Sequence, residues 1–162
     1  MKLKPNGTYH IYNRGNNKQK IFFSERNYLF FLKKIDRQLT GTIDLLAYCL
    51  MPNHFHLMVS THSNFEHTIF SNKYRIMLSS YTRAINNQED RTGSLFQQNS
   101  KAVEVLGNEH ATACLSYIHF NPVKANLAVQ MEDWAYSSIH EYKESGELSL
   151  CNISLAKELI DL

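Results

Sequence analysis

The chain has 162 residues, 43% of them hydrophobic, which suffices for one domain with a substantial core. Its formal net charge of +2 does not by itself indicate a nucleic-acid-binding protein, and its three widely spaced cysteines, without a Cys-x-x-Cys pair, argue against a disulfide framework or a zinc-thiolate site. No signal-peptide pattern or membrane-spanning apolar run occurs, so we expect a cytoplasmic protein with no membrane partner.

The first predicted element is a strand over residues 8–15, a stretch rich in β-forming residues that ends at a turn beginning with Gly15. Side chains alternate between the two faces of a strand. The polar residues His10, Tyr12 and Arg14 would therefore share one face.

A helix and a hairpin follow. Apolar residues recur at helical spacing up to residue 39, and Ser24 precedes them as an N-cap, which predicts a helix over residues 24–39. The apolar run 43–50 and the segment 54–60 flank the turn residues Pro52-Asn53, which predicts an antiparallel hairpin.

A second helix is expected from Asn64 to Ile85, because its aromatic and aliphatic residues form one stripe. Residues 101–106 then predict a strand that completes the sheet. Asn108 could cap a third helix, which we expect to stop near Asn121 because a proline follows it.

The order strand, helix, strand, strand, helix, strand, helix predicts the α+β class. Specifically, it predicts a ferredoxin-like (split βαβ) antiparallel sheet with helices on one face, plus an additional C-terminal helix. We expect a single domain over residues 1–162, in which residues 130–162 form a packed C-terminal extension. An amphipathic piece at residues 153–162 ends it.

The most distinctive stretch is His54-Phe55-His56, at the start of the strand after the Pro52-Asn53 turn. In a strand His54 and His56 share a face, with backbones about 7 Å apart, so both rings can converge on one metal ion. A lone His-x-His is weak evidence of metal binding. Two ligands do not complete a metal site, so a third ligand must come from elsewhere in the chain.

The predicted third helix offers that ligand. Tyr117 and Asn121 are four residues apart and lie on one helical face. Two imidazoles and the Asn121 amide oxygen would form a neutral three-ligand site that leaves the full charge of a divalent cation available to a phosphodiester.

Tyr117 is then the candidate nucleophile, which would give a covalent phosphotyrosine and a free hydroxyl on the other strand end. Lys124 and His119 are candidate activating neighbours. A tyrosine in a short apolar helix is, however, most often a core residue whose hydroxyl reaches the surface.

Five blocks of the sequence, taken together, resemble the single-tyrosine HUH transposases, especially the REP-associated tyrosine transposase branch of the IS200-like family. The blocks occur in order over about residues 9–142. They are Tyr9-His-Ile-Tyr-Asn-Arg-Gly15, Tyr48-Cys-Leu-Met-Pro-Asn-His-Phe-His-Leu-Met-Val59, Gly93-Ser-Leu-Phe-Gln97, Tyr117-Ile-His-Phe-Asn-Pro-Val-Lys-Ala125 and Trp134-Ala-Tyr-Ser-Ser138.

The resemblance implies that His54, His56 and Asn121 hold Mg²⁺ or Mn²⁺ and that Tyr117 forms a 5′-phosphotyrosine link. It further implies a ferredoxin-like endonuclease and strand transferase that acts on single-stranded DNA beside hairpins. The chain departs from the family pattern at Gln98-Asn-Ser100, where relatives commonly carry a basic segment, and at Ala135-Tyr136.

DNA contacts are expected from cations along the backbone and from aromatic stacking. The candidates are Arg14, Lys18, Lys20, Arg83, Phe96, Lys101 and Lys124. Each of them could instead be an ordinary surface or core residue.

Two other functions remain open at the level of sequence. One is a domesticated protein that binds hairpin DNA without cutting it, and the other is a metal-dependent hydrolase in which water is the nucleophile. The sequence also leaves open whether the protein acts as a monomer or a homodimer.

Overall fold

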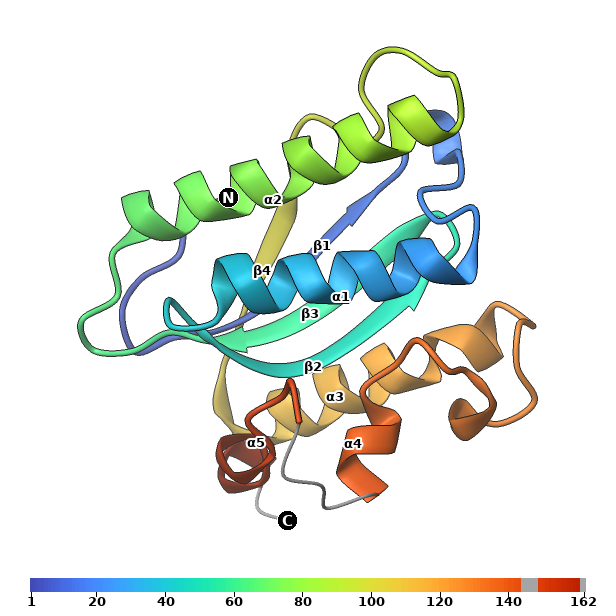
Figure 1. Ribbon diagram of the computed structural model, residues 1–162. Coiled ribbons are helices and arrows are strands. Elements are labelled where there is room, and N and C mark those ends of the chain that lie inside the picture. Colours follow the sequence, from blue (N-terminus) through green and yellow to red (C-terminus); the bar gives the residue numbers. More distant parts are fainter. Residues whose placement is uncertain (144–148, 161–162) are drawn as a thin grey trace.

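A computed structural model describes residues 1–143 and 149–160 of the chain (Figure 1). The described residues form four strands, five α-helices and two short 3-10 helices. The strands are β1 (Thr8–Arg14), β2 (Asp44–Met51), β3 (His54–Ser60) and β4 (Lys101–Val105). The helices are η1 (Asn16–Lys18), α1 (Glu25–Leu39), α2 (His67–Gln88), α3 (Gly107–Lys124), η2 (Met131–Asp133), α4 (Ile139–Lys143) and α5 (Ile153–Ile160).

The strands form one sheet in the order β2-β3-β1-β4, and every neighbouring pair is antiparallel. With the helices between them, this is the ferredoxin-like arrangement, which confirms the predicted fold class. β3 and β1 are the two inner strands, so their side chains are flanked by strands on both sides.

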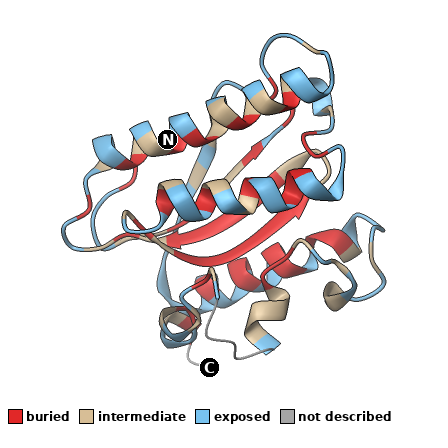
Figure 2. Ribbon diagram, in the orientation of Figure 1, coloured by how far each residue is buried: buried red, intermediate tan, exposed pale blue. Residues whose placement is uncertain are grey.

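The two faces of the sheet are covered by different helices. α1 and α2 lie on one face, and α3 crosses the other together with α5 (Figure 1). Figure 2 shows buried residues along both inner strands and on the helix faces that meet the sheet. α3 is thus the additional helix that the sequence predicts, and a second, smaller core lies beneath it.

β3 shows the predicted alternation. Phe55, Leu57 and Val59 are fully buried in the core under α1 and α2. Met58 belongs to the core under α3, so His54 and His56, which share its face, also point toward α3.

The β2–β3 turn, Pro52-Asn53, is fixed by the segment after β1. The Gly15 amide donates a 2.8 Å hydrogen bond to the Asn53 carbonyl, and the Ile21 amide donates one of 2.8 Å to the Pro52 carbonyl. The turn immediately precedes His54, so these bonds also hold the first residue of β3 in place.

Residues 134–138 cover the outer edge of β2. The Leu50 amide donates to the Tyr136 carbonyl (2.9 Å), and the Ser138 amide donates to the Tyr48 carbonyl (3.0 Å). Trp134 Nε1 donates to the Leu50 carbonyl at 3.0 Å. The opposite edge strand, β4, pairs only with β1 within the described ranges.

The boundaries of α3 differ from the prediction. The helix begins at Gly107 rather than after an Asn108 cap, and it continues through Pro122 to Lys124. Pro122 cannot donate to the Ile118 carbonyl. The helix nevertheless continues past it, and the Ala125 amide donates to the Asn121 carbonyl (3.0 Å). α2 is likewise shifted by three residues toward the C-terminus at each end, to His67–Gln88.

The amphipathic piece expected at residues 153–162 contains the helix α5, and residues 161–162 lie outside the described residues. Across residues 1–143 and 149–160, no helix has both the length and the apolar character required to cross a membrane.

Candidate active site

The two histidines of β3 lie side by side at the start of the strand. Their ring centroids are 5.0 Å apart and the ring planes are nearly perpendicular, at 89°. His54 Nδ1 lies 2.7 Å from Asn53 Oδ1. An amide oxygen only accepts, so Nδ1 carries the proton and the lone pair of the neutral ring is on Nε2.

His56 is held by a third histidine, His10 of β1. His10 Nε2 lies 2.9 Å from His56 Nδ1, so one ring donates to the other. His56 is only 5% exposed, and its Nε2 atom is buried with no hydrogen-bond partner among the described residues. A buried polar atom without a partner is uncommon in proteins and calls for a ligand or ion.

Tyr117 of α3 faces this cluster. Its ring centroid lies 5.5 Å from that of His56 and 5.9 Å from that of His10. The Tyr117 side chain is nevertheless 44% exposed. On the same helix, Lys124 Nζ lies 5.7 Å from the centre of the Tyr117 ring. A substrate could therefore reach the phenol from solvent, beside the positive charge of Lys124.

Asn121 joins the tyrosine to the histidines. Its Nδ2 donates to the Tyr117 carbonyl at 2.8 Å, and its side chain also contacts His54 through a hydrogen bond that raises the pKa of His54. Asn121 is only 8% exposed. Oδ1 is the acceptor atom of this amide, so it is the atom that could bind an ion on the His54 side.

Burial keeps these imidazoles neutral. Desolvation lowers the pKa of His56 to about 3, with smaller contributions from the charges of His10 and His54. Desolvation, and to a lesser extent His110, lowers the pKa of His10 to about 4. It also lowers the pKa of His54, although the Asn121 contact opposes this shift. At neutral pH the rings can therefore act as lone-pair donors.

The donor set fits a divalent cation held by His54, His56 and Asn121. No group of three His, Cys, Asp or Glu residues in the described part of the chain could hold a metal ion. The third ligand would therefore have to be an amide. The unpartnered His56 Nε2 supports this assignment, as does the bond from His10 to the other ring nitrogen, because metal-binding histidines commonly donate that N–H to a fixed partner.

A cavity of about 420 Å³ opens beside the tyrosine, between the sheet and α3. His10, Tyr12 and His56 line it from the inner strands, Val103 from β4, and Tyr117 from α3. The space adjoins both the phenol and the histidines, so a substrate group could lie against them.

A sequence model of the family described as "Transposase IS200 like" matches residues 4–121. The chain belongs to this family. A Haemophilus influenzae protein classed provisionally as a REP-associated tyrosine transposase is 24% identical over 106 residues, which are 60% of this chain and 59% of that protein. The chain thus spans about three fifths of the length of this relative.

Among solved structures, that of a REP-associated tyrosine transposase bound to a REP hairpin has a TM-score of 0.71 with 18% identity. The match covers 93% of this chain and 87% of the other. At this identity the likeness shows the fold alone. A Deinococcus radiodurans protein regarded as a transposase matches with a TM-score of only 0.44.

Several cations proposed for DNA contact lie around the site of this member of the IS200-like family. Arg14 is opposite His54 in the β1–β3 register, and Lys101 is opposite Tyr12 in the β1–β4 register. Both side chains are exposed.

The remaining cations proposed for DNA contact are also exposed. Lys18 and Lys20 lie in the segment that is bonded to the turn before His54, and Lys124 lies beside Tyr117. Arg83 differs, because it lies on α2, which covers the opposite face of the sheet.

The prediction that Phe96 stacks on DNA bases is wrong. Phe96 is only 5% exposed, and its ring packs against Phe31, Phe55 and Tyr81 in the core under α1 and α2. Only a small part of the side chain remains exposed, so Phe96 is not an open stacking platform on the protein surface.

His119, a candidate activating neighbour of Tyr117, is bonded to the C-terminal segment instead. Its Nε2 lies 2.8 Å from Ser138 Oγ, and its ring packs edge-on against Tyr142. Two residues along a helix correspond to a rotation of about 200°, so His119 points away from the tyrosine and holds the C-terminal segment on α3.

His10 and Tyr12 are the site residues that the sequence analysis did not select. Their ring centroids lie 5.0 and 5.9 Å from that of His56. The one available signal was that both belong to the polar face of the first predicted strand. Which strand this face would meet depends on the β1–β3 register, which is a property of the assembled sheet.

Proposed function

We propose that the protein is a metal-dependent endonuclease and strand transferase that nicks and rejoins single-stranded DNA through Tyr117. The observation that carries the proposal is the pairing of an exposed phenol with a buried, unpartnered His56 Nε2 in the same chain. A core tyrosine would be buried, whereas Tyr117 is open to solvent on the face that meets the histidines.

The reaction exchanges one phosphoester for another. The Tyr117 hydroxyl oxygen attacks the phosphorus, its proton is lost, and the P–O bond to the 3′ oxygen of the upstream nucleotide breaks. That oxygen takes up a proton and leaves as a free 3′ hydroxyl, and the phosphate stays on the tyrosine as a 5′-phosphotyrosine. Attack by a 3′ hydroxyl on this ester reverses the process and rejoins strands without a nucleotide cofactor.

Four further residues of the site have roles in this scheme. His54, His56 and Asn121 would hold Mg²⁺ or Mn²⁺, which when bound polarises the phosphoryl group and stabilises the leaving oxygen. Lys124, whose Nζ lies 5.7 Å from the centre of the Tyr117 ring, would supply a positive charge next to the phosphodiester.

We propose that the DNA lies across the α3 face of the sheet and that a hairpin flanks the cut site. Arg14 and Lys101 would contact phosphates on either side of the tyrosine, because both lie on the strand face that carries the histidines. Lys18 and Lys20 extend this positive edge beyond the β2–β3 turn. The relative of known structure that was solved with a REP hairpin supports the choice of partner.

One chain carries every residue that this chemistry requires. We therefore propose that residues 1–162 act as one unit and that a monomer suffices for cleavage, whether or not the protein forms a homodimer. Residues 130–162 would serve as an extension that fixes α3 through the contact between His119 and Ser138.

The test is to incubate the protein with a hairpin-bearing single strand and Mn²⁺ and to look for a denaturant-resistant protein–DNA adduct. Tyr117→Phe should abolish the adduct completely. Tyr12→Phe is the matched control, because Tyr12 also lies close to His56 and lines the same cavity. It should still form the adduct.

The other two functions predict different outcomes. A hydrolase that uses water would cleave without any adduct, and Tyr117→Phe would keep part of its activity. A binding protein that does not cut would retain hairpin DNA in the presence of chelator and show no cleavage with any metal. Either result would contradict the proposal.

A further inference from the structure

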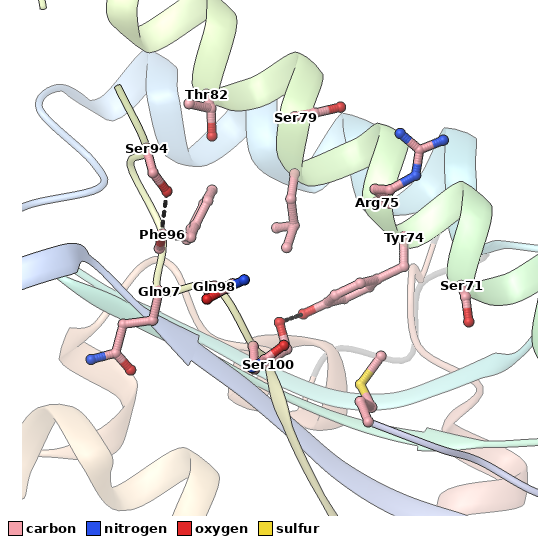
Figure 3. Close-up of a pocket in the computed structure, with 13 residues that line it drawn as sticks. Ser71, Tyr74, Arg75, Ser79, Thr82, Ser94, Phe96, Gln97, Gln98 and Ser100 are labelled. Carbon is pink, nitrogen blue, oxygen red and sulfur yellow. Dashed lines mark hydrogen bonds between the residues drawn. The ribbon is translucent and has the colours of Figure 1, made fainter. Parts of the chain in front are cut away.

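A second cavity, of about 470 Å³, lies on the opposite side of the sheet from Tyr117. It opens between α2 and the segment 94–100 that leads into β4 (Figure 3). A space of this size is within the range of pockets that hold small aromatic ligands.

The walls of this cavity suit a flat, uncharged ring. Leu78, Tyr74 and a small exposed part of Phe96 give it apolar surfaces. Its lining residues include Arg75 but no carboxylate, so the cavity does not suit a cation. An arginine beside a neutral pocket is instead suited to a phosphate attached to the ring.

Polar groups without partners face the space. The Gln98 amide lies on the cavity side of the loop, and the Thr82 hydroxyl points down from α2 toward it (Figure 3). Neither side chain has a hydrogen-bond partner in the part of the chain that the structure describes. Amide and hydroxyl groups of this kind can donate to and accept from the edge of a nucleobase.

The base of the cavity is closed by hydrogen bonds between its polar side chains. The Tyr74 hydroxyl donates to Ser100 Oγ at 2.8 Å, and Asn13 Nδ2 donates to the same oxygen at 2.8 Å. Asn13 Nδ2 also donates to the Gln97 carbonyl, at 3.1 Å. The polar side chains at the base are thus bonded to one another, whereas Gln98 and Thr82 are available to a ligand.

The same residues connect this cavity to the tyrosine site. Asn13 lies in β1 between Tyr12 and Arg14, which point to the α3 face. Lys101, the residue after Ser100, begins β4 and is opposite Tyr12 in the register. A single strand that leaves the Tyr117 site past Lys101 would reach this cavity around the unpaired edge of β4.

We propose that this cavity holds one unpaired base of the single-stranded DNA that is cut at Tyr117, with Gln98 and Thr82 contacting the polar edge of the base. This inference rests on the proposed function, because it takes single-stranded DNA as the substrate. It adds a base-selective contact several nucleotides from the cut, made by neutral groups on the other side of the sheet.

The experiment measures DNA binding in a Tyr117→Phe background, in which no cleavage interferes. The probe is a hairpin strand from the DNA beside the gene, with unpaired flanks, in which one flanking nucleotide at a time is made abasic. One abasic position should weaken binding at least about fivefold, the loss expected for a single buried base.

Two variants assign that loss to the cavity. Thr82→Trp fills the space, so it should weaken binding of the intact strand by a similar factor and make the sensitive abasic position neutral. Gln98→Ala should reduce the effect of that abasic position in part. Gln97→Ala is the matched control, because Gln97 borders the cavity but its side chain leads away from α2 (Figure 3); it should behave like the parent protein. Thermal unfolding checks that each variant is folded.

The outcomes separate the two proposals. If wild-type protein forms the Tyr117 adduct but no abasic position depends on Thr82 or Gln98, this inference fails and the proposed function stands. If free dAMP binds as tightly as the strand and no abasic position matters, the cavity is a mononucleotide site and the inference is overturned. If no adduct forms, the proposed function fails, whatever the cavity binds.

Discussion

His10 Nε2 lies 2.9 Å from His56 Nδ1, so the ring that faces Tyr117 is oriented by a histidine from the neighbouring strand. This bond holds the His56 ring in place, and with His56 Nδ1 as the donor its unpartnered Nε2 carries the lone pair that a metal ion needs. A metal-binding imidazole needs such a partner to hold its orientation and to increase its basicity.

His10→Ala should therefore weaken Mn²⁺ binding by about 10- to 100-fold, the usual loss when the partner of a metal-binding histidine is removed. Isothermal titration with Mn²⁺ alone, without DNA, measures this directly. His10→Gln should recover part of the affinity, because a glutamine can still bond to His56 Nδ1. His62→Ala is the control, since His62 interacts with Asp44 away from the site. Unchanged Mn²⁺ affinity in His10→Ala would show that His10 does not position His56.

The active site should be complete in one chain, because Tyr117 lies beside the histidines of its own sheet. Mixing Tyr117→Phe with His56→Ala should then give no adduct above that of either variant alone. If the tyrosine of one molecule served the histidines of another, the mixture would regain activity. Such recovery would contradict a site formed in cis.

His119 should matter for stability rather than for chemistry. It is buried and bonded to Ser138, which also bonds to the main chain of β2. His119→Ala removes this bond and leaves a cavity, at a cost of about 2 kcal/mol in the free energy of unfolding. Ser116→Ala, on the exposed side of α3, should change it by less than about 0.5 kcal/mol. Urea unfolding tests both, and a stable His119→Ala that fails to form the adduct would contradict this assignment.

The protein should lose stability as the pH falls below neutrality. Burial lowers the pKa of His119 from 6.5 to about 4, and that of His56 to about 3. An unfolded chain therefore takes up protons below pH 6.5 that the folded chain does not, and the free energy of unfolding decreases with falling pH. For His119 alone the decrease between pH 6.5 and 4 is at most about 3 kcal/mol.

Urea titrations between pH 7 and 4 measure this trend, and His119→Asn should show a shallower decrease than the wild type. Stability that is constant or rises over this interval would mean that these imidazoles are charged in the folded protein.

Much of the fold follows from local patterns in the sequence. A strand over residues 54–60 places His54 and His56 on one face, because side chains alternate between the two faces of a strand. The spacing of Tyr117 and Asn121 places both on one side of a helix, and the structure brings that side to the histidines. These predictions depend only on residues close together in the chain.

What the sequence did not reveal depends on contacts between distant segments. Phe96 is an aromatic residue of the kind that stacks on bases. It is buried, however, because the segment before β4 packs against the core. His10 meets His56 only because β1 and β3 pair in one register. Pro122 lies within α3 rather than ending it, since a proline in the last turn removes only one donor and is buried against neighbouring residues.

The most direct test of the account is to identify the residue that carries DNA after the reaction. The adduct formed with a hairpin strand and Mn²⁺ is digested with protease and nuclease, and the modified peptide is sequenced by mass spectrometry. We predict a nucleotide joined through its 5′ phosphate to Tyr117 and to no other residue. Attachment to Tyr12 or to any other side chain, or cleaved DNA with no modified peptide, would contradict the assignment of Tyr117 as the nucleophile beside His54 and His56.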